Sequence, residues 1–294
     1  MPRERGVTLA EQATLWKTAH FSCIDRAILM DGNSSSPKQI ALLIEQNVED
    51  VEFLMPYHAL QKAGAKVVVL GSRLNADYRG KKGKVSIKAE GTTSEAIATD
   101  FDAVVIPGGG APDHMRANEN TIRFVQEAFE SGVLVATVCH GPQVLIDADL
   151  LKGIKATGFY AIRKDMMNAG AHYVDAPLAS EKNLLTARRP GDLPIFTTAL
   201  LQRLALSIPD TTLPDINTLD AGWWKLGEEW GGSTKADIIQ AINTVIAAER
   251  YSVELFEHYA NHLQDSEAIA AFQDLCTHQQ QHLQQLEARL RIVD

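Results

Sequence analysis

Apolar and polar residues alternate in blocks along the larger part of the chain. Short runs of aliphatic and β-branched residues, such as those at 67–70, 103–106 and 133–138, are separated by stretches with helical spacing. Runs with almost no polar interruption are typical of strands that helices cover on both faces of a parallel sheet. From residue 38 to about residue 207 the pattern therefore predicts an α/β domain built from strand–helix–strand units.

A different organisation follows this domain. The segment at 208–222 is rich in turn-forming residues and has neither strand nor helix periodicity, so it is interpreted as a linker. Beyond it, apolar residues recur every three or four positions at about 235–262 and 266–292, which predicts two antiparallel helices. We expect an N-terminal extension at 1–36, the α/β domain at 37–207, the linker, and a helical hairpin domain at 223–294.

Composition and charge narrow the class of protein. Of the 294 residues, 45% are hydrophobic and 22% are charged, which is ordinary for a soluble globular protein. The net charge of −9 argues against a nucleic-acid partner, because binding phosphates requires a basic face. No apolar run has the length of a membrane span or a secretory signal. We expect a cytoplasmic protein without membrane or nucleic-acid partners, and its three cysteines, an odd number, to be reduced thiols.

Cys139 stands at a point where a nucleophile is expected. It directly follows the apolar run at 133–138 and precedes a predicted helix that begins near Pro142. A tight strand-to-helix turn of this kind presents a nucleophile at the sheet edge, and Gly141 allows the close backbone approach that the turn requires. The positive end of the helix favours the thiolate. The alternative is that Cys139 is an inert, buried small side chain.

A glycine-rich loop follows another apolar run. In the sequence PGGG at 107–110, backbone N–H groups can turn toward a developing oxyanion, so Gly108 and Gly109 are the candidate donors. The alternative is a simple turn. No dinucleotide-binding or Walker spacing accompanies these glycines, so we expect no nucleotide and no other cofactor.

Further blocks accompany these motifs in a fixed order: NVEDVEF, VIPGGGAPDHMR, VATVCHGPQVL, DMMNAGA and TARRPGDLPIFTTALLQRL. Across residues 38–206 the chain resembles the PfpI family, the intracellular-protease and deglycase-like branch of the class I glutamine amidotransferase superfamily. The resemblance implies a flavodoxin-like sandwich with a mostly parallel sheet. It also implies that Cys139 is the nucleophile with His140 beside it, and that Glu49 is the carboxylate that meets the thiol.

The same resemblance implies that Asp113 reaches the histidine of a neighbouring subunit, so that the active site requires a homo-oligomer. An exposed helix-capping aspartate is the alternative for Asp113. For Glu49 the alternative is that, with Asp50 and Glu52, it supplies negative charge to the first turn of a helix. A carboxylate next to a thiolate cannot comfortably ionise with it, so one member of such a pair should hold a proton at neutral pH.

These residues predict a stress-related enzyme that uses thiolate attack on a small carbonyl compound, with backbone donors to the oxyanion. The resemblance favours methylglyoxal or glycated adducts as substrates, in a glyoxalase or deglycase reaction. An intracellular cysteine peptidase is one alternative. A thiol-based oxidative-stress sensor or chaperone is the non-enzymatic alternative, because an accessible thiolate also oxidises readily.

The predicted hairpin is similar to half of a rubrerythrin- or ferritin-like bundle, in which helices supply carboxylates and a histidine to a di-iron site. Glu249 and His282 match two of those ligand positions. Gln279, a weak neutral ligand, stands where a second carboxylate is expected. We therefore predict no metal, with Glu249 and His282 as the candidates if one is bound, and interpret the hairpin as a dimerisation or packing module.

Overall fold

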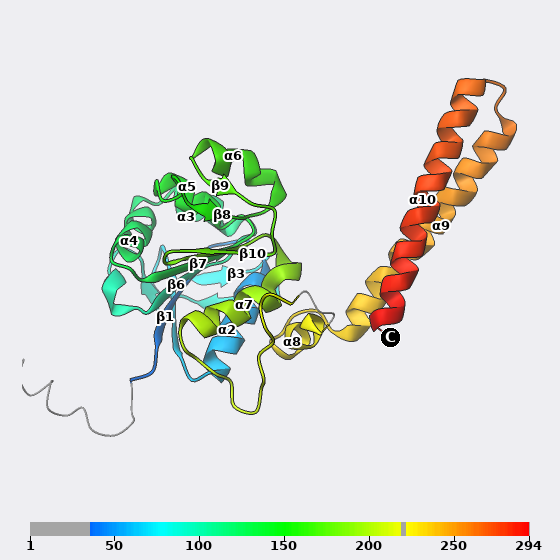
Figure 1. Cartoon of the computed structure of the whole chain (residues 1–294). Coiled ribbons are helices and arrows are strands. Elements are labelled where there is room, and N and C mark those ends of the chain that lie inside the picture. The colour runs from blue at the N-terminus through cyan, green and yellow to red at the C-terminus, as the bar shows by residue number, and fades with distance from the viewer. Residues whose placement is uncertain (1–35, 219–221, 294) are drawn as a thin grey trace, which may run out of the picture. The chain divides into compact units, whose positions relative to one another are not determined.

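The computed structural model describes residues 36–218 and 222–293, and a seven-stranded sheet forms its centre (Figure 1). The strands lie in the order β10-β11-β7-β6-β1-β2-β5. Adjacent strands are parallel except at one edge, where β10 runs antiparallel to β11. Their bounds are Gln39–Leu43 (β1), Lys66–Gly71 (β2), Gly91–Thr92 (β5), Ala103–Ile106 (β6), Leu134–Val138 (β7), Leu178–Glu181 (β10) and Leu184–Ala187 (β11). The predicted α/β class and mostly parallel sheet are confirmed.

The apolar runs in the sequence form the central strands. Every residue of β6 and β7 is buried, and Val105 pairs in register with Leu42 on one side and Ala136 on the other. Such strands have no face for water, which is why their sequences lack a polar alternation.

Two groups of helices cover the sheet (Figure 1). One group contains α2 (Asp50–Lys62), α7 (Leu193–Arg203) and α8 (Trp223–Glu229); the other contains α3 (Ala111–Arg116), α4 (Glu119–Glu130), α5 (Pro142–Asp147) and α6 (Arg163–Asn168). The central strand order β2-β1-β6-β7-β11 is the flavodoxin-like order. In sheets of this topology ligands bind beyond the carboxyl ends of the strands, where the order reverses beside the first strand.

Short elements complete the domain. They are β3 (Asp77–Arg79), β4 (Ser86–Lys88), β8 (Lys155–Ala156), β9 (His172–Tyr173) and the 3-10 turns η1 (Ala98–Asp100), η2 (Tyr160–Ile162) and η3 (Pro190–Asp192). A buried carboxylate anchors the tip of the β3–β4 hairpin. Asp50 accepts hydrogen bonds of 2.7 Å from the backbone amides of both Lys82 and Val85. Gly80 leaves room for this carboxylate, because a Cβ there would overlap it.

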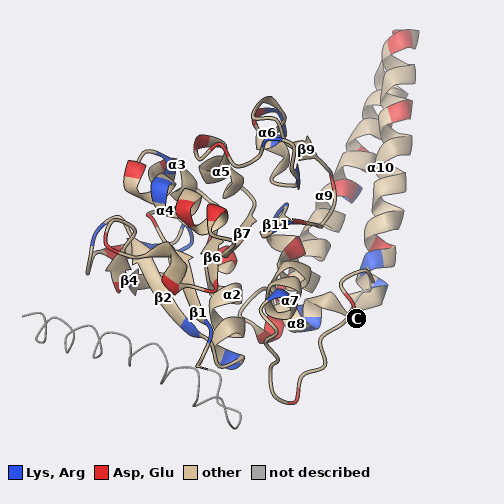
Figure 2. Ribbon diagram, turned by 60° about the vertical axis from the view of Figure 1, so that its left-hand side comes forward, with Lys and Arg blue, Asp and Glu red and all other residues tan. Residues whose placement is uncertain are grey.

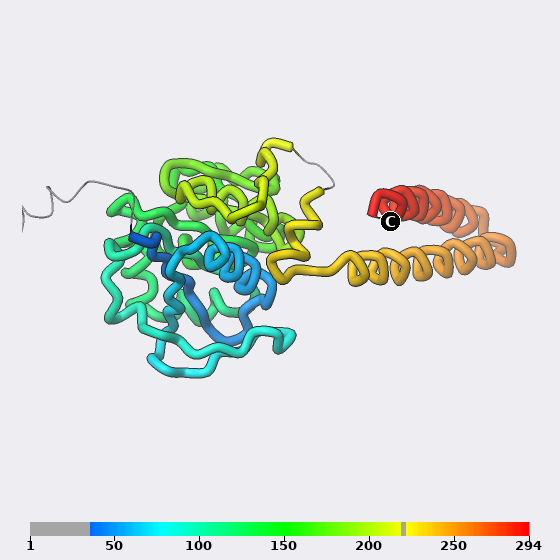
Figure 3. The backbone as a smooth tube through the Cα atoms, turned by 90° about the horizontal axis from the view of Figure 1, so that it is seen from below, coloured from blue at the N-terminus to red at the C-terminus, as the bar shows by residue number. Residues whose placement is uncertain are grey.

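Two long helices form the C-terminal part. α9 (Lys235–His262) starts at a capping box made by Thr234 and Asp237, and α10 (Ser266–Val293) returns alongside it (Figure 3). The rings of Phe256 and Phe272 pack 5.9 Å apart between them. The predicted helical hairpin is confirmed. None of the helices in the described ranges has the length and apolar character needed to cross a membrane.

The short helix α8 lies outside this hairpin. It packs against α7, and the carbonyl of Trp230 lies 3.3 Å from Nδ1 of His58 on α2. Residues 208–218 of the predicted linker contain no regular element. The association of α8 with the α/β domain was not predicted from the sequence, because α8 has too few residues to show a reliable period.

Replacing Asp50 with Ala is expected to lower the free energy of unfolding by about 2–3 kcal/mol, because the amides of the buried Val85 and of Lys82 lose their acceptor. Burial disfavours the charged form of Asp50, but the amides of Lys82 and Val85 outweigh burial and hold its pKa below the ordinary value. The stabilisation is therefore present above that ordinary pKa and is lost on acidification. Urea unfolding at neutral pH measures the effect.

Asp77→Ala is the matched control, since Asp77 is exposed at the start of the same hairpin. Its effect should stay within about 0.5 kcal/mol. Equal losses in the two variants would contradict the anchoring role of Asp50.

Candidate active site

Cys139 occupies the sharp turn between β7 and α5. Its φ angle is 60°, in the left-handed region that non-glycine residues rarely adopt. At Gly141 a Cβ would overlap Oγ1 of Thr137, so glycine is required for the chain to turn this closely. The strand, strained residue and helix are those of the predicted nucleophile elbow.

Backbone amides surround the sulfur. Sγ of Cys139 lies 3.3 Å from Nδ1 of His140, and the N–H groups of Gly109 and His140 donate to the sulfur and favour its ionised form. The side chain is only 7% exposed. Two amides converging on one reactive atom can also stabilise negative charge on a substrate oxygen bound beside it.

The amide of Gly108 has a different partner from the predicted one. It donates a 2.8 Å hydrogen bond to Oε2 of Glu52, and a Cβ on Gly108 would lie 2.6 Å from that oxygen. Of the two predicted oxyanion donors, Gly108 is therefore engaged by a carboxylate. The amide of His140 joins that of Gly109 in its place.

The carboxylate that meets the thiol is Glu52, and not Glu49 as the resemblance implied. Glu52 lies in the first turn of α2, is fully buried and interacts with the Cys139 thiol. Glu49 precedes the helix, and its two carboxylate oxygens each lie 3.6 Å from an ammonium group, that of Lys81 or of Lys82. Glu52 lies on the stripe of α2 that includes the buried Met55, but Glu49 precedes Glu52 by three residues and fits the same spacing, so the pattern does not select between them.

Glu52 and Cys139 control each other's protonation. Burial raises the pKa of Glu52 from its ordinary 4.5 to about 7, although the thiol and the Gly108 amide oppose the change. Burial, and then the charge of Glu52, raise the pKa of the Cys139 thiol. Oε1 of Glu52 is buried and has no hydrogen-bond partner among the described residues. A proton held by Glu52 removes the repulsion that opposes a thiolate, so the two side chains share one proton near neutral pH.

His140 forms the outer side of this centre. Its imidazole stacks on the ring of Phe159 with the centroids 4.8 Å apart. Burial lowers the pKa of His140, and the charge of Asp113 opposes this effect. The imidazole is therefore neutral at pH 7 and can accept a proton. Asp113 is exposed on α3, and its role in a neighbouring subunit stays a prediction.

The candidate metal ligands of the hairpin lie near each other. Nδ1 of His282 is 3.9 Å from Oε1 of Glu249, while Oε2 of Glu249 and Oε1 of Gln279 are buried without hydrogen-bond partners among the described residues. In the part of the chain that the structure describes, no group of three or more histidines, cysteines or acidic residues could hold a metal ion. One hairpin therefore does not provide the donor set of a di-iron centre, and we derive no chemistry through a metal.

Comparison with known proteins covers both parts of the chain. Residues 38–203 match the DJ-1/PfpI family. Putative cysteine protease YraA of Bacillus subtilis is 42% identical over 167 residues, which are 57% of this chain and 98% of that protein. Deglycase PfpI of Pyrococcus furiosus is 41% identical over 155 residues, 53% of this chain and 92% of that protein. Protein/nucleic acid deglycase 2 of Escherichia coli is 38% identical over 168 residues, 57% and 98% of the two chains.

A solved structure extends the similarity to the C-terminal helices. It is a two-domain protein from Anabaena variabilis containing DJ-1/ThiJ/PfpI-like and ferritin-like domains. The match has 58% sequence identity and a TM-score of 0.85, and covers 87% of this chain and 76% of that chain. The helical hairpin thus has its counterpart in a protein that contains a ferritin-like domain.

The free energy of unfolding of the wild type is expected to fall as pH rises, because Glu52 ionises in a buried position. In Glu52→Gln this fall should be absent. Because its folded pKa is raised from 4.5 to about 7, Glu52 contributes stability that is fully present below 4.5 and is lost as pH rises through about 7. The full difference corresponds to roughly 3 kcal/mol. Urea unfolding at about pH 4 and about pH 8 measures it.

The matched control is Glu49→Gln, which removes the carboxylate that pairs with Lys81 and Lys82. This variant should keep most of the alkaline loss of stability, because burial, and not the charge of Glu49, is the largest cause of the raised Glu52 pKa. If Glu52→Gln keeps it as well, the assignment of the shared proton to Glu52 is contradicted.

Proposed function

The chain belongs to the DJ-1/PfpI family, and on this premise we propose that it is a cysteine-dependent enzyme that acts on methylglyoxal or on the adducts that methylglyoxal forms with amines. The observation that carries the proposal is the strained Cys139, with the amides of Gly109 and His140 directed at its sulfur and the proton-bearing Glu52 against it. Two of the relatives bear the name deglycase.

The first step is addition of the Cys139 thiolate to the aldehyde carbon. A C–S bond forms, the carbonyl π electrons move to oxygen, and the resulting oxyanion lies where the amides of Gly109 and His140 can donate to it. A hemiaminal adduct first loses its amine: nitrogen gains a proton, the C–N bond breaks, and the hydroxyl loses its proton to form the aldehyde C=O. The thiolate then adds to this aldehyde as above.

Proton transfers complete the reaction. Neutral His140 takes the proton from the former aldehyde carbon, Glu52 exchanges its proton with the substrate oxygens, and the hydrogen is returned to the neighbouring carbon. The product is a thioester of lactate, which water hydrolyses to lactate and the free thiol. Methylglyoxal and water have then become lactic acid: the aldehyde carbon is oxidised, the ketone carbon is reduced, and no external oxidant is needed.

Two other functions use the same thiol. A peptidase would attack an amide carbon, and one relative is named a putative cysteine protease. A thiol sensor of oxidative stress would have the Cys139 thiolate attack peroxide and form a sulfenic acid. The burial that raises the pKa of Cys139 limits the thiolate in this reaction as it does in carbonyl addition.

The proposal includes assembly of a cytoplasmic homo-oligomer, in which Asp113 of the partner subunit approaches His140. Within one chain the charge of Asp113 already favours the protonated form of His140. A second carboxylate from an adjoining subunit would act in the same direction and assist the proton transfers.

Cys139→Ser is expected to lower the rate of methylglyoxal consumption at least about a thousandfold, because the nucleophile is lost. The measurement is a time course of methylglyoxal and lactate with purified protein. Cys276→Ser, which alters the other described cysteine, should keep the wild-type rate. Absence of turnover in the wild type, or equal rates in wild type and Cys139→Ser, would refute the proposed reaction.

A further inference from the structure

A cavity of about 260 Å³ adjoins the candidate active site. It is lined by Gly158, Phe159, Tyr160, Tyr173, Asp175, Arg188 and Arg189. Phe159 connects the two places, because its ring stacks on His140 and its amide donates a 2.8 Å hydrogen bond to the carbonyl of Cys139. A ligand in this cavity therefore lies against the same loop that supports the catalytic residues.

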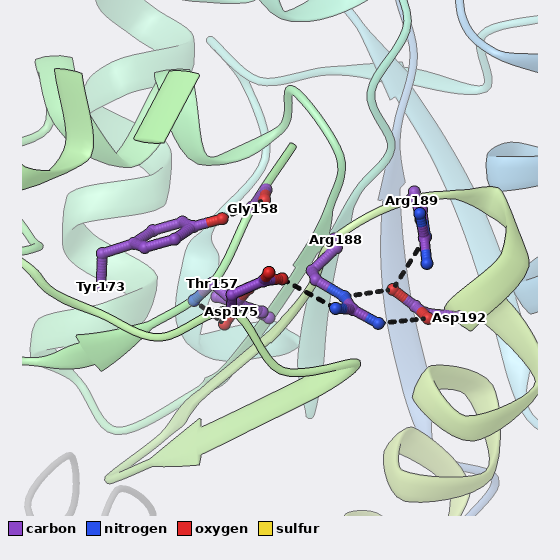
Figure 4. Close-up of polar contacts among 8 residues, drawn as sticks. Thr157, Gly158, Tyr173, Asp175, Arg188, Arg189 and Asp192 are labelled. Atoms are coloured by element: carbon purple, nitrogen blue, oxygen red, sulfur yellow. Dashed lines mark hydrogen bonds and ion pairs between the residues drawn. The ribbon is translucent and has the colours of Figure 1, made fainter. Parts of the chain in front are cut away.

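The buried carboxylate of Asp192 fixes the guanidinium group of Arg188 (Figure 4). Its Nε and Nη2 donate to the two oxygens of Asp192 at 2.9 and 3.2 Å. Asp192 itself is 6% exposed and is not part of the cavity wall. This two-point contact fixes the plane of the guanidinium and leaves Nη1 directed away from Asp192, toward Asp175.

Asp175 occupies the place that a bound carboxylate would take. Its Oδ1 accepts a 2.7 Å hydrogen bond from Nη1 of Arg188, while its side chain is 71% exposed. The Arg188 side chain is only 18% exposed, so its Nη1 needs an acceptor when Asp175 moves away. A carboxylate supplied by a ligand can provide that acceptor, while the exposed Asp175 returns to water.

Arg189 is the cation of the wall that is least engaged by acids. Two cations, Arg188 and Arg189, line the cavity with one acid, Asp175, and Asp192 behind the wall pairs with Arg188. The side chain of Arg189 is 61% exposed and its Nε is 4.0 Å from Asp192, too far for a strong hydrogen bond. The remaining side chains of the wall are aromatic, and Tyr173 uses its hydroxyl to donate to the carbonyl of Gly158. Aromatic faces suit the carbon atoms next to a carboxylate.

We propose that this cavity binds the carboxylate of the substrate, and that the preferred substrates are methylglyoxal adducts of free amino acids. Arg188 and Arg189 hold the carboxylate, Asp175 moves aside, and the adduct carbon lies toward Cys139 past Phe159. The proposal rests on the proposed function and names its substrate class. Arg188 and Arg189 are then residues that determine specificity.

The test compares two adducts that differ in one charge. Methylglyoxal adducts of alanine and of alaninamide are prepared and quantified, and kcat/KM is measured for each. The wild type should prefer the alanine adduct about tenfold or more, since a charge-assisted contact is lost with the amide. Arg189→Gln should lose most of this preference through a higher KM for the alanine adduct alone.

Asp175→Asn should raise kcat/KM for the alanine adduct, because the competing carboxylate is removed. Arg123→Gln, which alters an exposed arginine on α4, is the matched control and should keep the wild-type preference. Equal kcat/KM for the two adducts in the wild type, or an equal loss on both adducts in Arg189→Gln, overturns the proposal.

A binding measurement separates this proposal from the catalytic one. Calorimetric titration with N-acetylalanine and N-acetylalaninamide needs no turnover. Tighter binding of N-acetylalanine than of N-acetylalaninamide, with this difference reduced in Arg189→Gln, supports carboxylate binding in the cavity. If the wild type also consumes no adduct, only the proposed reaction is refuted. If both adducts are consumed and neither rate nor binding prefers the carboxylate, the proposed reaction is supported and carboxylate binding in the cavity is refuted.

Discussion

The structure depends on one constraint, the burial of two acidic groups in contact. The Cys139 thiol lies in the turn after β7 and the Glu52 carboxyl lies on α2, and neither can be ionised freely while the other is. Both side chains are nearly excluded from water, so their charges must be balanced by amides and by one shared proton. The amides come from the glycine loop after β6 and from the turn at His140. Three neighbouring strand ends therefore have to meet within hydrogen-bonding distance.

This requirement explains the polar residues around the site. Gly108 has no room for a side chain because Glu52 and the turn at His140 lie against it. Next to Glu52, Asp50 fastens the β3–β4 hairpin, and this hairpin presents Lys81 to Glu49. Two acids of one short segment thus organise the loops, while the third, Glu52, meets the thiol. Neutralising Asp50 would loosen the hairpin, neutralising Glu49 would remove its ion pairs with the lysines, and neutralising Glu52 would change the protonation of the thiol.

The parts that could be predicted from the sequence are those fixed by local pattern. Uninterrupted apolar runs identified the parallel strands, and the apolar period identified α9 and α10 to within one residue. Cys139 between a strand and Pro142 identified the elbow. The choice of Glu52 over Glu49 depends on where α2 begins relative to the glycine loop, which is a tertiary relation. The cavity was missed for the same reason, because Asp175 and Arg188 lie on separate loops that meet only after folding.

Charge is distributed unevenly in this molecule, and the distribution bears on its substrate. The chain has a net charge of −9, and residues 223–294 contain 11 acidic residues against 5 lysines and arginines, which accounts for −6 of it. Acidic residues appear on both helices of the hairpin (Figure 2). Around the thiol the charges are balanced: Lys81 and Lys82 pair with Glu49, Arg188 pairs with Asp175 and Asp192, and Arg189 of the cavity wall lies 4.0 Å from Asp192. When Asp175 moves away from Arg188, two arginines remain beside the single acid Asp192. A small carboxylate in the cavity then restores the balance of charge, which a neutral carbonyl compound does not.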